Sequence, residues 1–133
     1  MVIVYARQPH SPFHAWAVEQ IANAVENDGA ALNAISLAEL CSEAGVDSAA
    51  VATAVNSFGV QLVDVPAGAA EKCGTAYRAY RRKRKAEAGK DAPRTPLPDF
   101  FIGAHAELAG WELVTNDADR FKNYFPGVKL VTP

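Results

Sequence analysis

Four acidic residues stand where carboxylates can perform hydrolytic chemistry: Glu39, Asp99, Asp117 and Asp119. They lie near the ends of short apolar segments or at expected helix starts, and such positions meet at the carboxyl edge of an open parallel sheet. Clustered carboxylates repel one another unless a cation neutralises them. Hard oxygen ligands suit Mg²⁺ or Mn²⁺ rather than zinc. A metal held in this way can activate water and neutralise a phosphodiester.

Each acid also has an interpretation that needs no metal. Glu39 stands three residues after Ser36, which is the spacing of a helix capping box. Asp99 can serve only as the N-cap of the helix that follows it. Asp117 and Asp119 can be ordinary turn residues. Spacing alone leaves both interpretations open.

The elements that must position these acids alternate between short strands and helices. We expect helices at residues 11–28, 37–44, 48–58, 67–85 and 100–109. Three of the helix starts are marked by Ser11-Pro12, Ser36 and Ser48. We expect strands at residues 31–35, 60–65, 111–115 and 128–131. Residues 86–98 are predicted to form a loop, and so are residues 116–125, with room for one helical turn. This alternation predicts an α/β fold with a mainly parallel sheet between two helical layers, in a single domain over residues 1–133.

Composition excludes several classes of protein. The chain has 133 residues, half of them hydrophobic, which is enough for one ordinary core. No apolar run approaches the length of a membrane span, and no secretory signal is visible at the start. Two cysteines, Cys41 and Cys73, make neither a disulfide scaffold nor a zinc site. We therefore expect no membrane association and a cytoplasmic location.

The net charge of −2 hides a strong segregation of charge. Residues 1–71 carry one basic residue against eight acids, whereas residues 72–94 carry nine basic residues against two acids. The candidate phosphate-binding residues in this basic stretch are Arg78, Arg81, Arg82, Arg84 and Lys85. The alternative is a solvated helix end followed by a loop, because basic residues also suit a helix C-terminus.

Several segments together resemble the PIN-domain ribonucleases, and in particular the VapC-type toxins of toxin–antitoxin pairs. The resemblance rests on Leu97–Ala106, Leu113–Asp117 and Tyr124–Leu130, on Ile35–Leu40, which matches the segment bearing the family's second acid, and on the arginine-rich Ala76–Arg81. It covers nearly the whole chain. It implies the PIN fold and cleavage of RNA with Mg²⁺ or Mn²⁺.

The resemblance also implies roles for particular residues. Glu39, Asp99 and Asp117 match the acidic catalytic and metal site, with Asp119 as a possible fourth contributor. Thr115 and Asn116 match polar neighbours that orient Asp117. The basic stretch would guide the RNA backbone. The implied partners are a small antitoxin and a second copy of the chain.

The N-terminus departs from the family pattern, which opens with a short strand ending in an aspartate. Here Val2–Ala6 resembles the apolar run after that aspartate, so the first acid and its strand are absent. Either the start of the chain has been placed too far downstream and the natural protein is longer, or the shortened form is itself natural. We expect Val2–Tyr5 to fill the central strand position, because this segment has high β propensity.

Because the chain has one acid fewer than the family's site, we expect weak metal binding and low nuclease activity. Two alternatives stay open. The first is an inactive PIN-like module that binds RNA or an antitoxin without cutting. The second is an α/β domain whose acids are only caps and whose role is protein–protein assembly.

Overall fold

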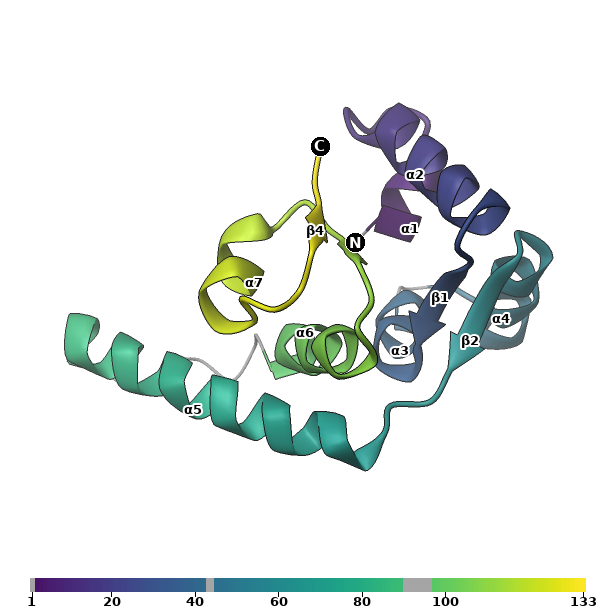
Figure 1. Ribbon diagram of the computed structural model, residues 1–133. Coiled ribbons are helices and arrows are strands. Elements are labelled where there is room, and N and C mark those ends of the chain that lie inside the picture. The colour runs from purple at the N-terminus through teal and green to yellow at the C-terminus, as the bar shows by residue number, and fades with distance from the viewer. Residues whose placement is uncertain (1, 43–44, 90–96) are drawn as a thin grey trace. The chain divides into compact units, whose positions relative to one another are not determined.

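The computed structural model describes residues 2–42, 45–89 and 97–133 (Figure 1). The chain divides into two compact units. Unit 1 contains residues 1–64, 114–116 and 133, and unit 2 contains residues 65–113 and 117–132. Each unit has its own cluster of buried apolar side chains. The single domain over residues 1–133 stays a prediction. Among the described residues, no helix has the length and apolarity needed to cross a bilayer.

Unit 1 is built on a parallel pair of strands. β1 (Ala30–Asn33) pairs with β2 (Val60–Val63), so that Ala30 lies opposite Val60 and Asn33 opposite Val63. Four helices accompany the pair: α1 (Val2–Arg7), α2 (His14–Glu26), α3 (Ala34–Cys41) and α4 (Ser48–Ser57). The core of unit 1 consists of the buried side chains of Leu40, Val51, Val55 and Val60.

Unit 2 is mainly helical. It contains α5 (Ala67–Ala88), α6 (Leu97–Ala109) and α7 (Ala118–Tyr124). Leu113 begins the short strand β3 (Leu113–Val114), and its N–H donates a hydrogen bond of 2.9 Å to the carbonyl oxygen of Lys129, which precedes the short strand β4 (Leu130–Val131). The long helix α5 packs along α6 (Figure 1).

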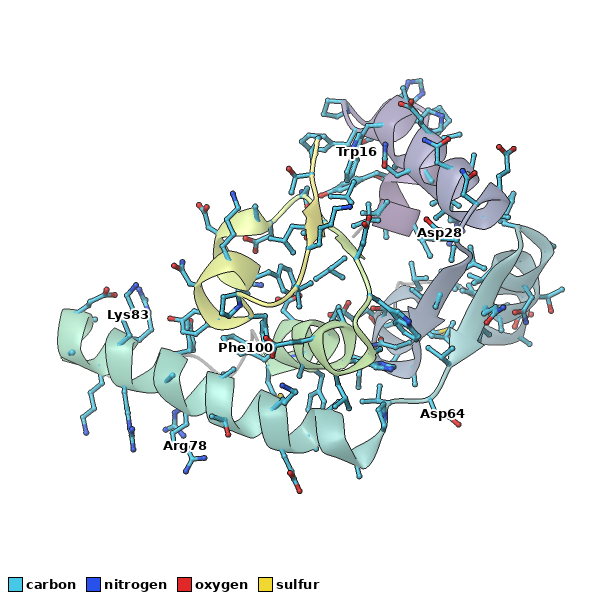
Figure 2. All side chains as sticks on the ribbon, viewed as in Figure 1. Trp16, Asp28, Asp64, Arg78, Lys83 and Phe100 are labelled. Atoms are coloured by element: carbon cyan, nitrogen blue, oxygen red, sulfur yellow. The ribbon has the colours of Figure 1, made fainter. Side chains whose placement is uncertain are left out.

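An aromatic cluster fills the core of unit 2. Phe100 of α6, labelled in Figure 2, is completely buried. Four aromatic rings lie around it. The ring centroids of Tyr77 and Tyr80 on α5 are 5.4 and 5.3 Å from that of Phe100, and those of Tyr124 and Phe125 are 5.2 and 5.7 Å away. Aromatic pairs in tilted or edge arrangements add to the stabilisation that area burial provides. The cluster therefore joins α5, α6 and the end of α7.

The fold class is confirmed: the chain combines helices with parallel strands in a mixed α/β arrangement. Within the described residues, the strands form two separate two-stranded sheets. The strands are also shorter than predicted, since residues 34–35 are helical and the fourth expected strand is reduced to Leu130–Val131.

The prediction that Val2–Tyr5 forms a strand is wrong, because this segment is the helix α1. A strand requires a partner edge, whereas this segment packs as a helix against α2 and places Ile3 and Val4 on the core of unit 1. Its β propensity is overridden by that packing, as is common for a propensity that depends on context. Arg7 in the last turn suits the helix dipole.

The predicted caps of two helices are also corrected. Asn33, not Ser36, caps α3, and its side-chain oxygen accepts a hydrogen bond from the Ser36 N–H at 2.9 Å. Glu39 therefore lies in the middle of α3, and the capping-box interpretation fails. Asp47, not Ser48, caps α4. In both cases an Asn or Asp upstream of the serine takes the N-cap position, and the serine lies within the helix.

Other boundaries shift by a few residues. α2 begins at His14 rather than at Ser11-Pro12, although the Ser11 hydroxyl still accepts a bond from the Phe13 N–H. α5 continues through residues 86–88, which we predicted as loop, and ends where Gly89 adopts a φ of 64°. Residues 97–98 of that predicted loop belong to α6, and residues 90–96 lie outside the described residues. Residues 118–124 form α7, which is longer than the single turn expected.

Candidate acidic site and basic groove

Asp99 projects from the first turn of α6, in unit 2. The helix begins at Leu97, so Asp99 is its third residue and not its N-cap. Pro98 is well tolerated beside it, because backbone N–H groups in the first turn have no partner inside the helix. The Asp99 side chain is 32% exposed and forms an ion pair with Arg120 of α7, through Oδ2 and Nη1.

Asp117 meets the same guanidinium. It occupies the N-cap position of α7, but its side chain makes no capping hydrogen bond. Instead its Oδ2 lies 3.4 Å from Nη2 of Arg120, three residues further along the chain. Two predicted site residues, 18 positions apart in the sequence, therefore converge on one arginine.

The electrostatics of Asp99 reflect both burial and its neighbours. Burial raises the pKa of this carboxyl above its ordinary value of 3.8, because water no longer solvates the charged form fully. The Arg120 guanidinium opposes the rise, while the negative charge of Asp117 adds to it. Burial is the largest of these effects, so the Asp99 carboxyl is harder to ionise than it is in water.

The other two predicted acids lie elsewhere in the chain. Glu39 is half-buried in α3 of unit 1. Asp119 is exposed in the first turn of α7. Over residues 2–42, 45–89 and 97–133, no three His, Cys, Asp or Glu side chains are gathered so that they could hold a metal ion. The metal site formed by Glu39, Asp99, Asp117 and Asp119 stays a prediction.

The predicted neighbours of Asp117 lie in unit 1. The side-chain amide of Asn116 donates a hydrogen bond to the Tyr5 hydroxyl of α1, at 2.7 Å. Thr115 is half-buried after β3. The orientation of Asp117 by Thr115 and Asn116 stays a prediction.

Most of the predicted RNA-binding residues share one face of α5. Four basic residues and two neighbours line a shallow groove there: Gly74, Tyr77, Arg78, Arg81, Arg82 and Lys85. Spacings of three and four residues place these side chains on the same side of a helix. Arg84 does not line the groove. The groove presents cations beside an aromatic ring, a combination that suits phosphates and bases.

Arg120 is the site residue that the sequence analysis missed. The signal was present, because an acid and an arginine three residues apart on a helix are neighbours. Its pairing with Asp99 had no such signal, since the two residues lie 21 positions apart and meet only when α7 packs on α6.

Comparison with known proteins now identifies the family. The family model of the PIN domain matches residues 2–125. The chain belongs to the PIN domain family. The resemblance noted in the sequence is thereby confirmed.

Solved structures support the PIN fold. A chain of the VapBC2 complex from Rickettsia felis, bound to a DNA fragment from its promoter, aligns at a TM-score of 0.57 with 23% identity, covering 98% of this chain and 92% of that one. A chain of DNA-bound VapBC from Salmonella typhimurium aligns at a TM-score of 0.61 with 19% identity, covering 98% and 91%. No curated protein matches the sequence.

Membership of the PIN family carries general expectations. PIN domains are typically ribonucleases, and they usually use divalent metals. The donor chemistry of Asp99 and Asp117 fits such an ion, because carboxylate oxygens are the ligands that Mg²⁺ and Mn²⁺ prefer. The two carboxylates already face a common point, which the Arg120 guanidinium holds.

Proposed function

We propose that this PIN domain is a Mg²⁺- or Mn²⁺-dependent endoribonuclease of the VapC type, which hydrolyses RNA phosphodiester bonds. One observation carries the proposal: Asp99 and Asp117 converge on a single cationic group in unit 2. Carboxylates from separate helices that meet in this way are suited to binding a cation. Family membership supplies the reaction class.

The proposed roles follow from residue chemistry. Asp99, Asp117, Glu39 and Asp119 would hold the metal ion, which would neutralise phosphate charge and make water a better nucleophile. The packing of α7 on α6 positions Asp99 and Asp117 relative to each other.

The groove on α5 would bind the RNA backbone. Its cations would do so by releasing the counterions that surround the phosphates.

A cleavage assay with matched variants tests the proposal. The chain should cut a labelled RNA with Mn²⁺ or Mg²⁺ and stop when EDTA is added. Asp99→Asn and Asp117→Asn should each slow cleavage by about 10²-fold or more, because each removes a charged ligand without changing size. Asp28→Asn, at an exposed acid labelled in Figure 2, should cut at the unchanged rate. Metal-stimulated cleavage that survives Asp99→Asn would refute the assignment.

We propose further that the 133-residue chain cuts slowly. The family acids matched in this chain are Glu39, Asp99 and Asp117, and a cation held by these alone would meet less negative charge than in a site with a further acid. A turnover with Mg²⁺ near the usual enzyme median of about 10 s⁻¹ would contradict this part of the proposal.

The second candidate is a PIN module that binds RNA or an antitoxin without cutting. The contact that favours it is the ion pairing of the Arg120 guanidinium with Asp99 and Asp117, which offsets one of their two negative charges without a metal. Retention of RNA without any cleavage in Mn²⁺, by a folded protein, would favour this candidate over the nuclease.

Partners and location complete the proposal. The structural relatives are described as VapBC complexes, and we propose that this chain pairs with a small antitoxin, forms a homodimer and acts in the cytoplasm. Light scattering after size exclusion tests the dimer, since the monomer has a mass of 14.2 kDa. A monomer at all concentrations would contradict the homodimer.

A further inference from the structure

We infer that Arg120 is an internal counter-cation of the acidic site, which competes with the divalent metal for Asp99 and Asp117. The inference rests on the proposed metal-dependent function and adds a residue that controls access of the metal. It explains how two partly buried carboxylates are held together in one unit.

The contact geometry supports the inference. Arg120 uses separate nitrogens for the two acids, with Nη1 on Oδ2 of Asp99 and Nη2 3.4 Å from Oδ2 of Asp117. The planar guanidinium presents its donors as a rigid fork, so one side chain can serve two carboxylates. Asp99 lies in the first turn of α6, Asp117 is the N-cap of α7, and Arg120 lies in the first turn of α7.

A divalent ion and this guanidinium compete for the same carboxylate oxygens. The ion needs carboxylate oxygens at about 2.0–2.1 Å for Mg²⁺, and those same oxygens face the arginine. Two cations at one small site also repel each other. Metal entry therefore requires Arg120 to leave, which its partial exposure of 34% allows. The apparent metal affinity equals the intrinsic affinity multiplied by the fraction of molecules in which Arg120 has left, so the ion pair lowers it.

Mn²⁺ binding to the full chain, followed by electron paramagnetic resonance of the free ion, tests the competition. Arg120→Ala should bind Mn²⁺ about tenfold more tightly than the unchanged chain. Adding Asp99→Asn to this variant should abolish the gain. Lys122→Ala removes an exposed cation from the same helix and should leave the affinity unchanged within about twofold.

Two further measurements cover the case in which Arg120→Ala does not fold. Arg120→Gln keeps a hydrogen-bond donor without the charge, and it should also bind Mn²⁺ more tightly. In the unchanged chain, the NMR signal of the Arg120 Nε–H should move when Mg²⁺ saturates the site, because the guanidinium is displaced. A signal that stays in place at saturation would overturn the inference.

The outcomes separate the two proposals. If the unchanged chain binds Mn²⁺ and the folded Arg120 variants bind it no more tightly, the competition is refuted while the metal site stands. If neither the folded unchanged chain nor the folded variants bind Mn²⁺, both the metal site and the competition are refuted.

Discussion

Gly103 of α6 lies directly against the ring of Phe125. A Cβ atom built on Gly103 would stand 2.5 Å from Cδ2 of Phe125 and 3.0 Å from Cδ1 of Phe121, closer than side-chain contacts normally come. Because Phe121 lies within α7 and Phe125 follows its last residue, the missing Cβ lets α7 pack on α6. That packing is what brings Arg120 to Asp99.

Substitution of Gly103 by alanine should therefore destabilise the protein. The added methyl group must displace Phe125 in a packed core, and overpacking of this kind costs about 1–3 kcal/mol. Urea unfolding measures the loss as a lower midpoint. Gly74→Ala is the matched control, since its Cβ would meet no atom within 4 Å and alanine in a helix is favoured by about 0.5–1 kcal/mol. Equal stability of the two variants would contradict the packing argument.

His105 should make folding stability depend on pH. This residue is 5% exposed, its ring lies 5.1 Å from that of Trp111, and burial lowers its pKa below the ordinary 6.5. Between the lowered value and 6.5 the unfolded chain binds more protons, so the free energy of unfolding falls as pH drops through that interval.

Urea titrations across pH 5 to pH 7.5 (about the range over which histidine titrates) measure this effect. His105→Gln should remove the contribution of this residue, giving a shallower slope than the unchanged chain. His10→Gln, at an exposed histidine, should keep the original slope. An unchanged slope in His105→Gln would show that the pH dependence has another origin.

Two neighbouring cations on α5 should differ in RNA binding. Arg82 lines the groove, whereas Lys83 does not, and one residue along a helix turns the side chain by about 100°. Arg82→Ala should lower the slope of log affinity against log salt by about 0.7, the value for one phosphate contact on a single strand. Lys83→Ala, at the residue labelled in Figure 2, should change it less. Equal slopes for both variants would argue against the groove as the RNA-binding surface.

Tyr5 and Asn116 should be coupled energetically. Their hydrogen bond of 2.7 Å joins α1 to the residues after β3 within unit 1. Tyr5→Phe and Asn116→Ala should each cost about 0.5–1.5 kcal/mol, and the double variant should cost less than the sum. A double-mutant cycle of unfolding free energies measures this coupling. Strict additivity would mean that the bond does not contribute to stability.

The sequence by itself determined the α/β alternation, the family and the pair of acids in unit 2. These depend on short-range patterns: apolar runs predict strands, and glycines such as Gly29 and Gly110, both with positive φ, end helices because they lack a Cβ. Motifs such as Pro98-Asp99 and Thr115-Asn116-Asp117 are likewise local, and they could be compared directly with the family pattern.

Only the tertiary structure decided that Val2–Tyr5 is helical and that Arg120 joins Asp99 to Asp117. The first depends on which surface is available to bury Ile3 and Val4, and intrinsic propensity is too weak to settle that question. The second depends on α7 packing against α6 where Gly103 leaves room for Phe125. Contacts between residues far apart in the chain form only when whole helices and strands pack together, so no local sequence pattern could predict them.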